Sequence, residues 1–202
     1  MKTGVVVGLL ACALAAGGCS ADKKAAARSD RGCPPAWKSG WQKLANRIGA
    51  PVYCPAWMPN PLDAKIGGEW DNGVSVKPDR SYLVSFLWHE SQSGDVHVNF
   101  RGYPGKTAIP TCEKLDTVNG RARRSRMPCF ADAIDRHRVA GEAVTVYAVN
   151  QDADQWHILY AWRHAGSLYA VSEHVIRPLN YRKVRRNLDR LVRGLTLLKP
   201  KG

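Results

Sequence analysis

The sequence predicts an α+β domain in which an antiparallel β-sheet packs against an N-terminal and a C-terminal helix. Three observations support this fold class: a helical apolar pattern at 37–48, alternating apolar residues at 82–175, and a second helical pattern at 180–198. Apolar residues recur about every 3.6 positions in helices and every two in strands, so the two patterns are distinct. By its length, 33–198 forms a single domain.

The first 18 residues are predicted to be a lipoprotein signal peptide. Lys2 precedes an uncharged apolar run, which is too short and too rich in glycine for a good transmembrane helix. Small residues lead into Cys19 and resemble the lipobox of bacterial lipoproteins, in which the cysteine is lipidated and the signal is removed. Cys12 follows a leucine at the position that the lipobox favours, but a signal that ended before Cys12 would have an apolar run too short for export. The alternative is an ordinary cleaved signal with a spare cysteine.

Residues 19–32 lack apolar periodicity and predict a lipidated, flexible tether. We therefore expect the protein on the extracytoplasmic face of a cell membrane or outer membrane. Its formal net charge of +13 falls to +12 without residues 1–18, which carry one lysine and no acidic residue. Such a charge favours an anionic lipid or an envelope polyanion as partner, although base composition of the genome also enriches arginine.

Four cysteines remain in the mature chain beside Cys19, and an even number in an exported protein predicts two disulfides. Three pairings are open, and we expect the local one, Cys33–Cys54 with Cys112–Cys129. None of the spacings is that of a redox or zinc motif, so structural bridges are favoured.

The first helix is predicted from apolar residues at helical spacing, which Gly49 then ends. The face consists of Trp37, Trp41, Leu44 and Ile48. In the chain-entropy model, a disulfide that closes a loop of this size stabilises the fold by about 3 kcal/mol.

Strands are predicted over 82–88, 96–100 and 143–149, with turns at 91–94 and at Asn119-Gly120. The clearest pair joins 157–163 to 168–175 through Ala165-Gly166. This register places Trp162 opposite Tyr169 and Tyr160 opposite Val171. One face of the pair is then aromatic, whereas the other carries small residues against which a helix could lie closely.

The second helix is predicted from Asn180, a plausible cap, to about Leu198. Its arginines would cover the outer surface. Its apolar stripe, expected against the sheet, is Tyr181, Val184, Leu188, Leu191 and Leu195.

Three stretches, 51–59, 141–147 and 157–171, together with the closing helix, resemble uncharacterised bacterial lipoproteins with an antiparallel sheet closed by a C-terminal helix. The resemblance covers residues 50–198. It implies a fold and assigns no catalytic residue.

The sequence contains neither a Gly-x-Ser-x-Gly nor a His-Glu-x-x-His motif, which favours a non-enzymatic role. In the register above, His157 and His174 face each other across two strands. Zinc usually takes three or four protein ligands, and the sequence supplies two here. We therefore expect no metal and no cofactor.

The densest basic run is predicted to be an anion-binding loop displayed between Cys112 and Cys129. Its arginines are Arg121, Arg123, Arg124 and Arg126. Arginine binds phosphate and carboxylate groups through paired hydrogen bonds. The alternative is a solvated turn. Export and the missing base-stacking platform argue against nucleic acid as a partner.

The leading hypothesis is a lipid-anchored envelope protein with a binding or structural role. One alternative is a lipid or glycolipid carrier, with an aromatic cavity between the sheet and the C-terminal helix. Another is an envelope hydrolase whose site is assembled from distant residues. A filled core with neither cavity nor catalytic cleft would favour the leading hypothesis.

Overall fold

The computed structural model describes residues 32–62, 70–90, 94–118, 120–151 and 154–201. The predicted signal peptide, Cys19, residues 20–31 of the tether, the turn residues 91–93 and Asn119 lie outside the described residues.

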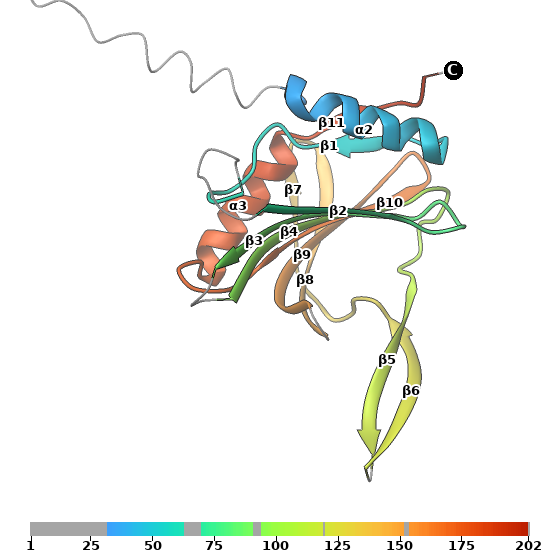
Figure 1. Ribbon diagram of the computed structural model, residues 1–202, viewed down its shortest axis with the longest axis vertical. Helices are drawn as coiled ribbons and strands as arrows, with labels where there is room; N and C mark the ends of the chain where they lie inside the picture. The colour runs from blue at the N-terminus through green and yellow to red at the C-terminus, as the bar shows by residue number, and fades with distance from the viewer. Residues whose placement is uncertain (1–31, 63–69, 91–93, 119, 152–153, 202) are drawn as a thin grey trace, which may run out of the picture.

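A seven-stranded antiparallel sheet forms the body of the protein, which confirms the predicted fold class (Figure 1). Strand β10 lies in its centre because it pairs with both β4 and β9. In spatial order the strands are β2 (Trp70–Val76), β3 (Tyr82–Glu90), β4 (Gly94–Tyr103), β10 (Ser167–His174), β9 (Asp154–His164), β8 (Glu142–Gln151) and β7 (Ala133–Val139).

The predicted register of β9 and β10 is confirmed. Trp162 pairs with Tyr169, and Tyr160 pairs with Val171. The turn residue Ala165 has φ 45° and Gly166 has φ 74°. Two successive residues in the left-handed region form the tight turn that matches the twist of a β-hairpin.

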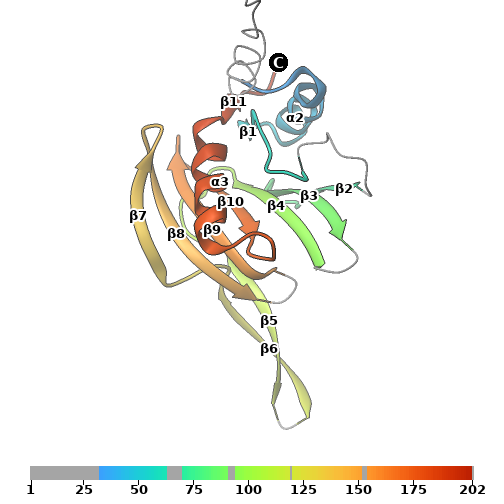
Figure 2. The ribbon, with the colours of Figure 1, turned by 90° about the vertical axis from the view of Figure 1, so that its left-hand side faces the viewer.

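Both described helices lie on the aromatic face of this sheet (Figure 2). Helix α2 (Pro35–Ile48) buries Trp41 and Leu44, and it ends at Gly49 with φ 58°, as predicted. Helix α3 (Tyr181–Arg193) is capped by Asn180, whose Oδ1 accepts a hydrogen bond from the backbone N–H of Lys183 at 2.9 Å. Neither helix is long and apolar enough to cross a membrane, a finding limited to the described residues.

The C-terminal helix is shorter than predicted. It ends at Gly194, and Thr196–Leu198 form strand β11, which pairs with β1 (Val52–Cys54). Residues 195–198 continue the helical stripe in sequence, but Thr196–Leu198 pair with β1 instead.

Two further predictions about packing are wrong. Tyr181 is 47% exposed, because the first turn of α3 packs its ring beneath the Arg185 guanidinium rather than on the sheet. No helix covers the small-residue face in the described part of the chain. The aromatic face, with its larger apolar area, takes both helices, and Phe130 packs against Ala161 and Ala170 on the other face.

The predicted basic loop is a two-stranded hairpin of β5 (Thr111–Val118) and β6 (Arg121–Pro128). It forms a separate sheet that projects from the body at the end of the molecule opposite α2 (Figures 1 and 2). Both predicted disulfides are present. Cys33–Cys54 joins the start of α2 to β1, and Cys112–Cys129 closes the base of the hairpin.

Candidate functional site

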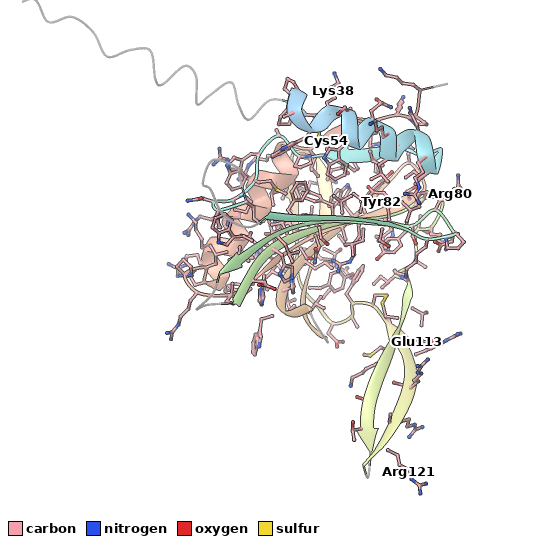
Figure 3. All side chains as sticks on the ribbon, in the orientation of Figure 1. Lys38, Cys54, Arg80, Tyr82, Glu113 and Arg121 are labelled. Carbon is pink, nitrogen blue, oxygen red and sulfur yellow. A yellow bond between two sulfur atoms is a disulfide. The ribbon has the colours of Figure 1, made fainter. Side chains whose placement is uncertain are left out.

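All four arginines of the predicted anion-binding set lie on β6 and are exposed, and Arg121 lies near the tip of the hairpin (Figure 3). Because successive side chains of a strand point to opposite faces, Arg121 and Arg123 share one face while Arg124 and Arg126 share the other. The hairpin therefore presents basic groups on both faces.

Acidic side chains offset only part of this charge. Arg124 lies 3.8 Å from Glu113, and Lys114 lies 2.8 Å from Asp116. Residues 111–128 contain five basic and two acidic side chains, so the hairpin keeps a net positive charge. Exposed ion pairs of this kind contribute only about 0–1 kcal/mol, and they leave the arginines able to bind another anion.

The hairpin depends on its base for order. An isolated two-stranded hairpin is marginally stable in water. Here the Cys112–Cys129 bond and the hydrogen bond from the Cys129 N–H to the Pro110 carbonyl, at 2.8 Å, join the two strands where they leave the body. The disulfide allows a segment with few apolar residues to stay extended outside the core.

The predicted facing pair, His157 and His174, is confirmed, and the structure adds His97 to it. Ring centroids of the three are separated by 4.4 to 5.0 Å. The His157 and His174 rings stack at an interplanar angle of 10° instead of converging on one point. Among the described residues, no group of His, Cys, Asp or Glu side chains is arranged to hold a metal ion.

A cavity of about 650 Å³ lies on the face of the sheet away from the helices, where sequence analysis placed no site. Strand β4 explains its polarity. Its alternate residues Val96, Val98 and Phe100 enter the core, whereas the residues between them line the cavity. These are His97, Asn99, Arg101 and Tyr103.

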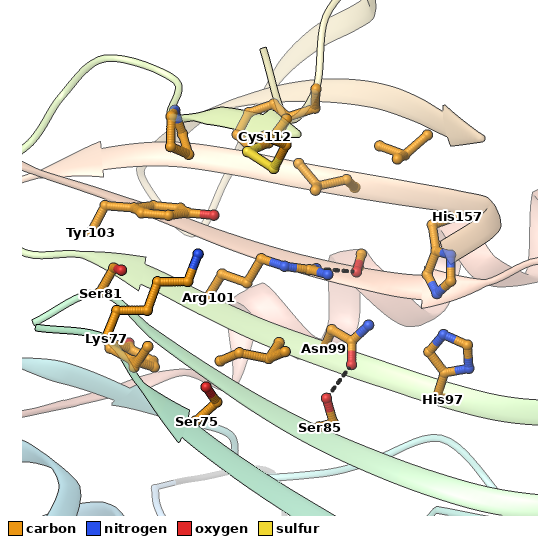
Figure 4. A pocket seen from close by; sticks show the side chains of 18 of the residues that line it. Ser75, Lys77, Ser81, Ser85, His97, Asn99, Arg101, Tyr103, Cys112 and His157 are labelled. Atoms are coloured by element: carbon orange, nitrogen blue, oxygen red, sulfur yellow. Dashed lines mark hydrogen bonds between the residues drawn. A yellow bond between two sulfur atoms is a disulfide. The ribbon is translucent and has the colours of Figure 1, made fainter. Parts of the chain in front are cut away.

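The cavity is roofed by segments far away in sequence. Pro110, the Cys112–Cys129 disulfide and Phe130 all line it. Its polar walls are partly fixed by hydrogen bonds: Ser85 Oγ donates to Asn99 Oδ1 at 2.7 Å, and Arg101 Nη1 donates to Ser172 Oγ at 3.0 Å (Figure 4).

Charges along the cavity are unevenly distributed. Lys77 and Tyr103 lie toward one end and the two histidines lie toward the other, while the Arg101 guanidinium reaches between them to Ser172 (Figure 4). The carboxylates of Asp79, Asp95 and Glu113 also line the cavity. The Asp79 carboxylate at the mouth is bound by Lys106, a hydrogen bond that holds the pKa of Asp79 well below its usual range.

A second titratable group is buried on the opposite, helix-covered face. Glu173 is fully buried beneath α3, and its Oε1 accepts a hydrogen bond from Asn187 Nδ2 at 2.7 Å. Burial raises the pKa of Glu173 to about 8, although Asn187 and Lys183 act in the other direction. Among the described residues, none is hydrogen-bonded to its Oε2.

The aromatic side chains on the helix-covered face of the sheet belong to the core. Tyr160, Trp162 and Tyr169 are each at most 2% exposed. Tyr53 from β1 packs edge-on against two of them, with ring centroids 5.3 Å from Trp162 and 4.8 Å from Tyr169. Aromatic side chains thus fill the space in which a carrier would hold its ligand.

Comparison of the chain with family models, curated proteins and solved structures finds no match. The resemblance to uncharacterised lipoproteins therefore stays a prediction, as does lipidation of Cys19.

Proposed function

We propose that this chain is a lipid-anchored envelope protein, without catalytic activity, that binds a linear anionic polymer through the β5–β6 hairpin. The observation that carries the proposal is the projection of this basic hairpin from the body with its arginines exposed.

The position of the hairpin indicates which kind of partner it can reach. The chain enters the domain at Cys33, beside the start of α2, and α2 lies at the opposite end of the molecule from the hairpin tip (Figure 1). A domain tethered at Cys33 can therefore extend its hairpin into the space beyond the anchoring membrane. A polymer in the space beyond that membrane fits this geometry better than the lipid headgroups around the anchor.

The charge of the hairpin indicates how strong and how salt-sensitive such binding is. Each cation that neutralises a charge on a linear polyanion releases a bound counterion, and log K falls by about 0.7–0.9 per contact for each tenfold rise in salt. Four arginines thus imply a salt slope of about 3 from the hairpin alone.

The anchor is tested by replacing Cys19 with Ser and labelling cells with a fatty-acid probe. We expect label and membrane association for the wild type. Cys19→Ser should carry no label and should either leave the membrane or accumulate as the unprocessed precursor. Equal labelling of both forms would remove the lipid anchor from the proposal.

The hairpin is tested in a soluble form that lacks residues 1–32, with linear polyphosphate as the polymer, and with anionic and neutral lipid vesicles alongside. Replacing Arg121, Arg123, Arg124 and Arg126 with Ser should weaken polyphosphate binding and lower its salt slope by about 3. A matched control removes four exposed positive charges from α3. Its substitutions are Arg182→Ser, Lys183→Ser, Arg186→Ser and Arg193→Ser.

The two variants have the same net charge, so their difference isolates the position of the charge. We expect the α3 variant to bind polyphosphate more tightly than the hairpin variant. Equal losses would mean that only net charge matters. Stronger binding to anionic vesicles than to polyphosphate, lost in the hairpin variant, would assign the hairpin to a membrane instead.

The packed aromatic core favours this binding role over the carrier hypothesis, because the cavity lies on the other face of the sheet. A hydrolase remains the alternative from another class, and turnover of an ester or amide substrate by the purified protein would favour it.

A further inference from the structure

We propose that the cavity on the open face of the sheet binds a small sugar-like anion, with its carboxylate or phosphate at Arg101 and Lys77. This site is separate from the exposed arginines of the hairpin, and the proposal does not rest on polymer binding.

The first argument is the burial of polar side chains on this face. His97 is 8% exposed, Asn99 is 4% exposed and Ser172 is 1% exposed, although all three lie on a sheet surface that apolar residues could fill. Buried polar groups need hydrogen-bond partners, as Asn99 has in Ser85 and Ser172 has in Arg101, whereas an apolar face beneath Phe130 would need none. Polar groups around a roofed cavity are the arrangement typical of a ligand site.

The second argument is the charge at one end. Lys77 and the hydroxyl of Tyr103 lie there, and the Arg101 guanidinium extends from this end toward Ser172 (Figure 4). Three carboxylates also line the cavity. Asp79 is bound by Lys106, and Glu113 lies 3.8 Å from Arg124, although neither of these cations lines the cavity. Asp95 belongs to the histidine end, since it lies six residues before Arg101 on β4, about 20 Å along a strand. This end of the cavity therefore favours an anion.

The third argument is the chemistry of the remaining walls. From Arg101 to His97 the strand spans about 13 Å, enough for a ring with its substituents. The Ser85–Asn99 pair and the imidazoles offer both donors and acceptors, which suit hydroxyl groups. Leu159 and Phe130 add apolar surface that can cover the C–H face of a sugar ring.

A volume of about 650 Å³ is within the range of small-molecule sites. These features together favour a phosphorylated or carboxylated sugar over a bare inorganic anion, which would leave most of the cavity unused.

The test measures binding by the soluble form lacking residues 1–32 with ligand-observed NMR and calorimetry. The probes are glucose 6-phosphate, glucuronate, glucose and inorganic phosphate. We expect one or both sugar anions to bind with a dissociation constant below about 10 mM, at least tenfold more tightly than glucose or phosphate.

Arg101→Gln should weaken sugar-anion binding by about tenfold to a hundredfold, because it removes a hydrogen-bonding charge. Lys77→Gln is an exposed substitution that spares folding and should weaken binding several-fold. The matched control is Arg163→Gln, which removes a positive charge on the same face of the sheet. Arg163 lies outside the cavity lining and donates to the Thr107 carbonyl at 2.9 Å, so we expect unchanged binding.

Failure of both sugar anions to bind overturns the proposal. Glucose binding as tightly as the sugar anions also overturns it, because the anionic group would then contribute nothing to affinity. Phosphate binding as tightly does the same, because the sugar would then contribute nothing. An equal loss in Arg163→Gln and in Lys77→Gln would show that net charge, not the cavity, attracts the ligand. The hairpin variant should keep sugar-anion binding, so the failure of either proposal can be recognised separately.

Discussion

Two segments of this protein are closed by disulfides of similar sequence separation, but one packs into the core and the other projects from the body. Cys33–Cys54 joins residues 21 apart, and Cys112–Cys129 joins residues 17 apart. The first segment folds as α2 and β1 into the core, where Trp41 and Ile48 are at most 5% exposed. The second projects as the hairpin, whose strand β6 has no fully buried residue.

The difference shows that a disulfide closes a segment but does not decide where it lies. The pattern of apolar residues decides whether the segment lies in the core or outside it. The first segment places Trp41, Leu44 and Ile48 on one helical face, whereas 121–126 offers four arginines and no large apolar side chain. Hydrophobic burial therefore holds the first segment in the core, and only backbone pairing and the covalent bond hold the second together.

The largest expected effect comes from removing an anchor of the packed segment. Trp41 is 5% exposed and packs edge-on against Phe100, with ring centroids 5.6 Å apart. Trp41→Ala should lower the free energy of unfolding by about 3–5 kcal/mol in denaturant titration. Arg124→Ala on the hairpin is the control and should stay within about 0.5 kcal/mol. Similar losses in both would contradict the comparison.

Removing the disulfide of the packed segment should have the next largest effect. Replacing Cys33 and Cys54 with Ser should lower the free energy of unfolding by about 3 kcal/mol, because the unfolded chain regains the entropy of an open loop while α2 stays packed. Calorimetry should show this as a lower melting temperature. An unchanged melting temperature would mean that packing alone fixes this segment.

The body should also dominate the pH dependence of stability. The folded pKa of Glu173 is about 8 against an ordinary value of 4.5, so the stability that neutral Glu173 contributes is fully present below pH 4.5 and is lost as pH rises towards 8. Glu173→Gln keeps a neutral side chain, and it should raise the free energy of unfolding by about 2–3 kcal/mol at pH 7. The gain should vanish near pH 4. The exposed substitution Glu113→Gln is the control, with a change within about 0.5 kcal/mol. A gain that persists at pH 4 would exclude titration as its cause.

Opening the hairpin should change global stability least. Replacing Cys112 and Cys129 with Ser should alter the free energy of unfolding by no more than about 1 kcal/mol, because the native hairpin gains much of the freedom that the unfolded chain gains. Trypsin cleavage within 121–126 should accelerate markedly. If cleavage stays slow while the body melts earlier, the hairpin contributes more to the core than its exposure indicates.

Elements with strong local signals could be predicted from the sequence. Helix α2, the β9–β10 register and both disulfides depend on short spacings, on a two-residue turn or on cysteines close in the chain. The end of α3 could not be predicted, since residues 195–198 continue a helical pattern and only pairing with β1 makes them a strand. Strands β2 and β7 at the sheet edges were also missed.

Of the candidate sites, the arginine run and the facing pair of His157 and His174 could be located from the sequence, although a loop was predicted where the run forms one of two paired strands. The cavity gave a partial signal. His97, Asn99 and Arg101 alternate with apolar residues, as on any half-exposed strand. What makes them cavity residues is the roof formed by 110–112 and 129–130, and that contact depends on tertiary structure.

The disulfide at the start of α2 also determines how the molecule would carry mechanical load. Force applied to the chain before Cys33 passes through the sulfur atoms to Cys54 in β1, so α2 lies in a covalently bypassed loop and is not stretched. Strand β1 passes that force to β11 and the C-terminal segment. A pull on the hairpin likewise enters the body across Cys112–Cys129. Tension between anchor and partner is thus borne by the hairpin and the strands of the body, while helix α2 is spared.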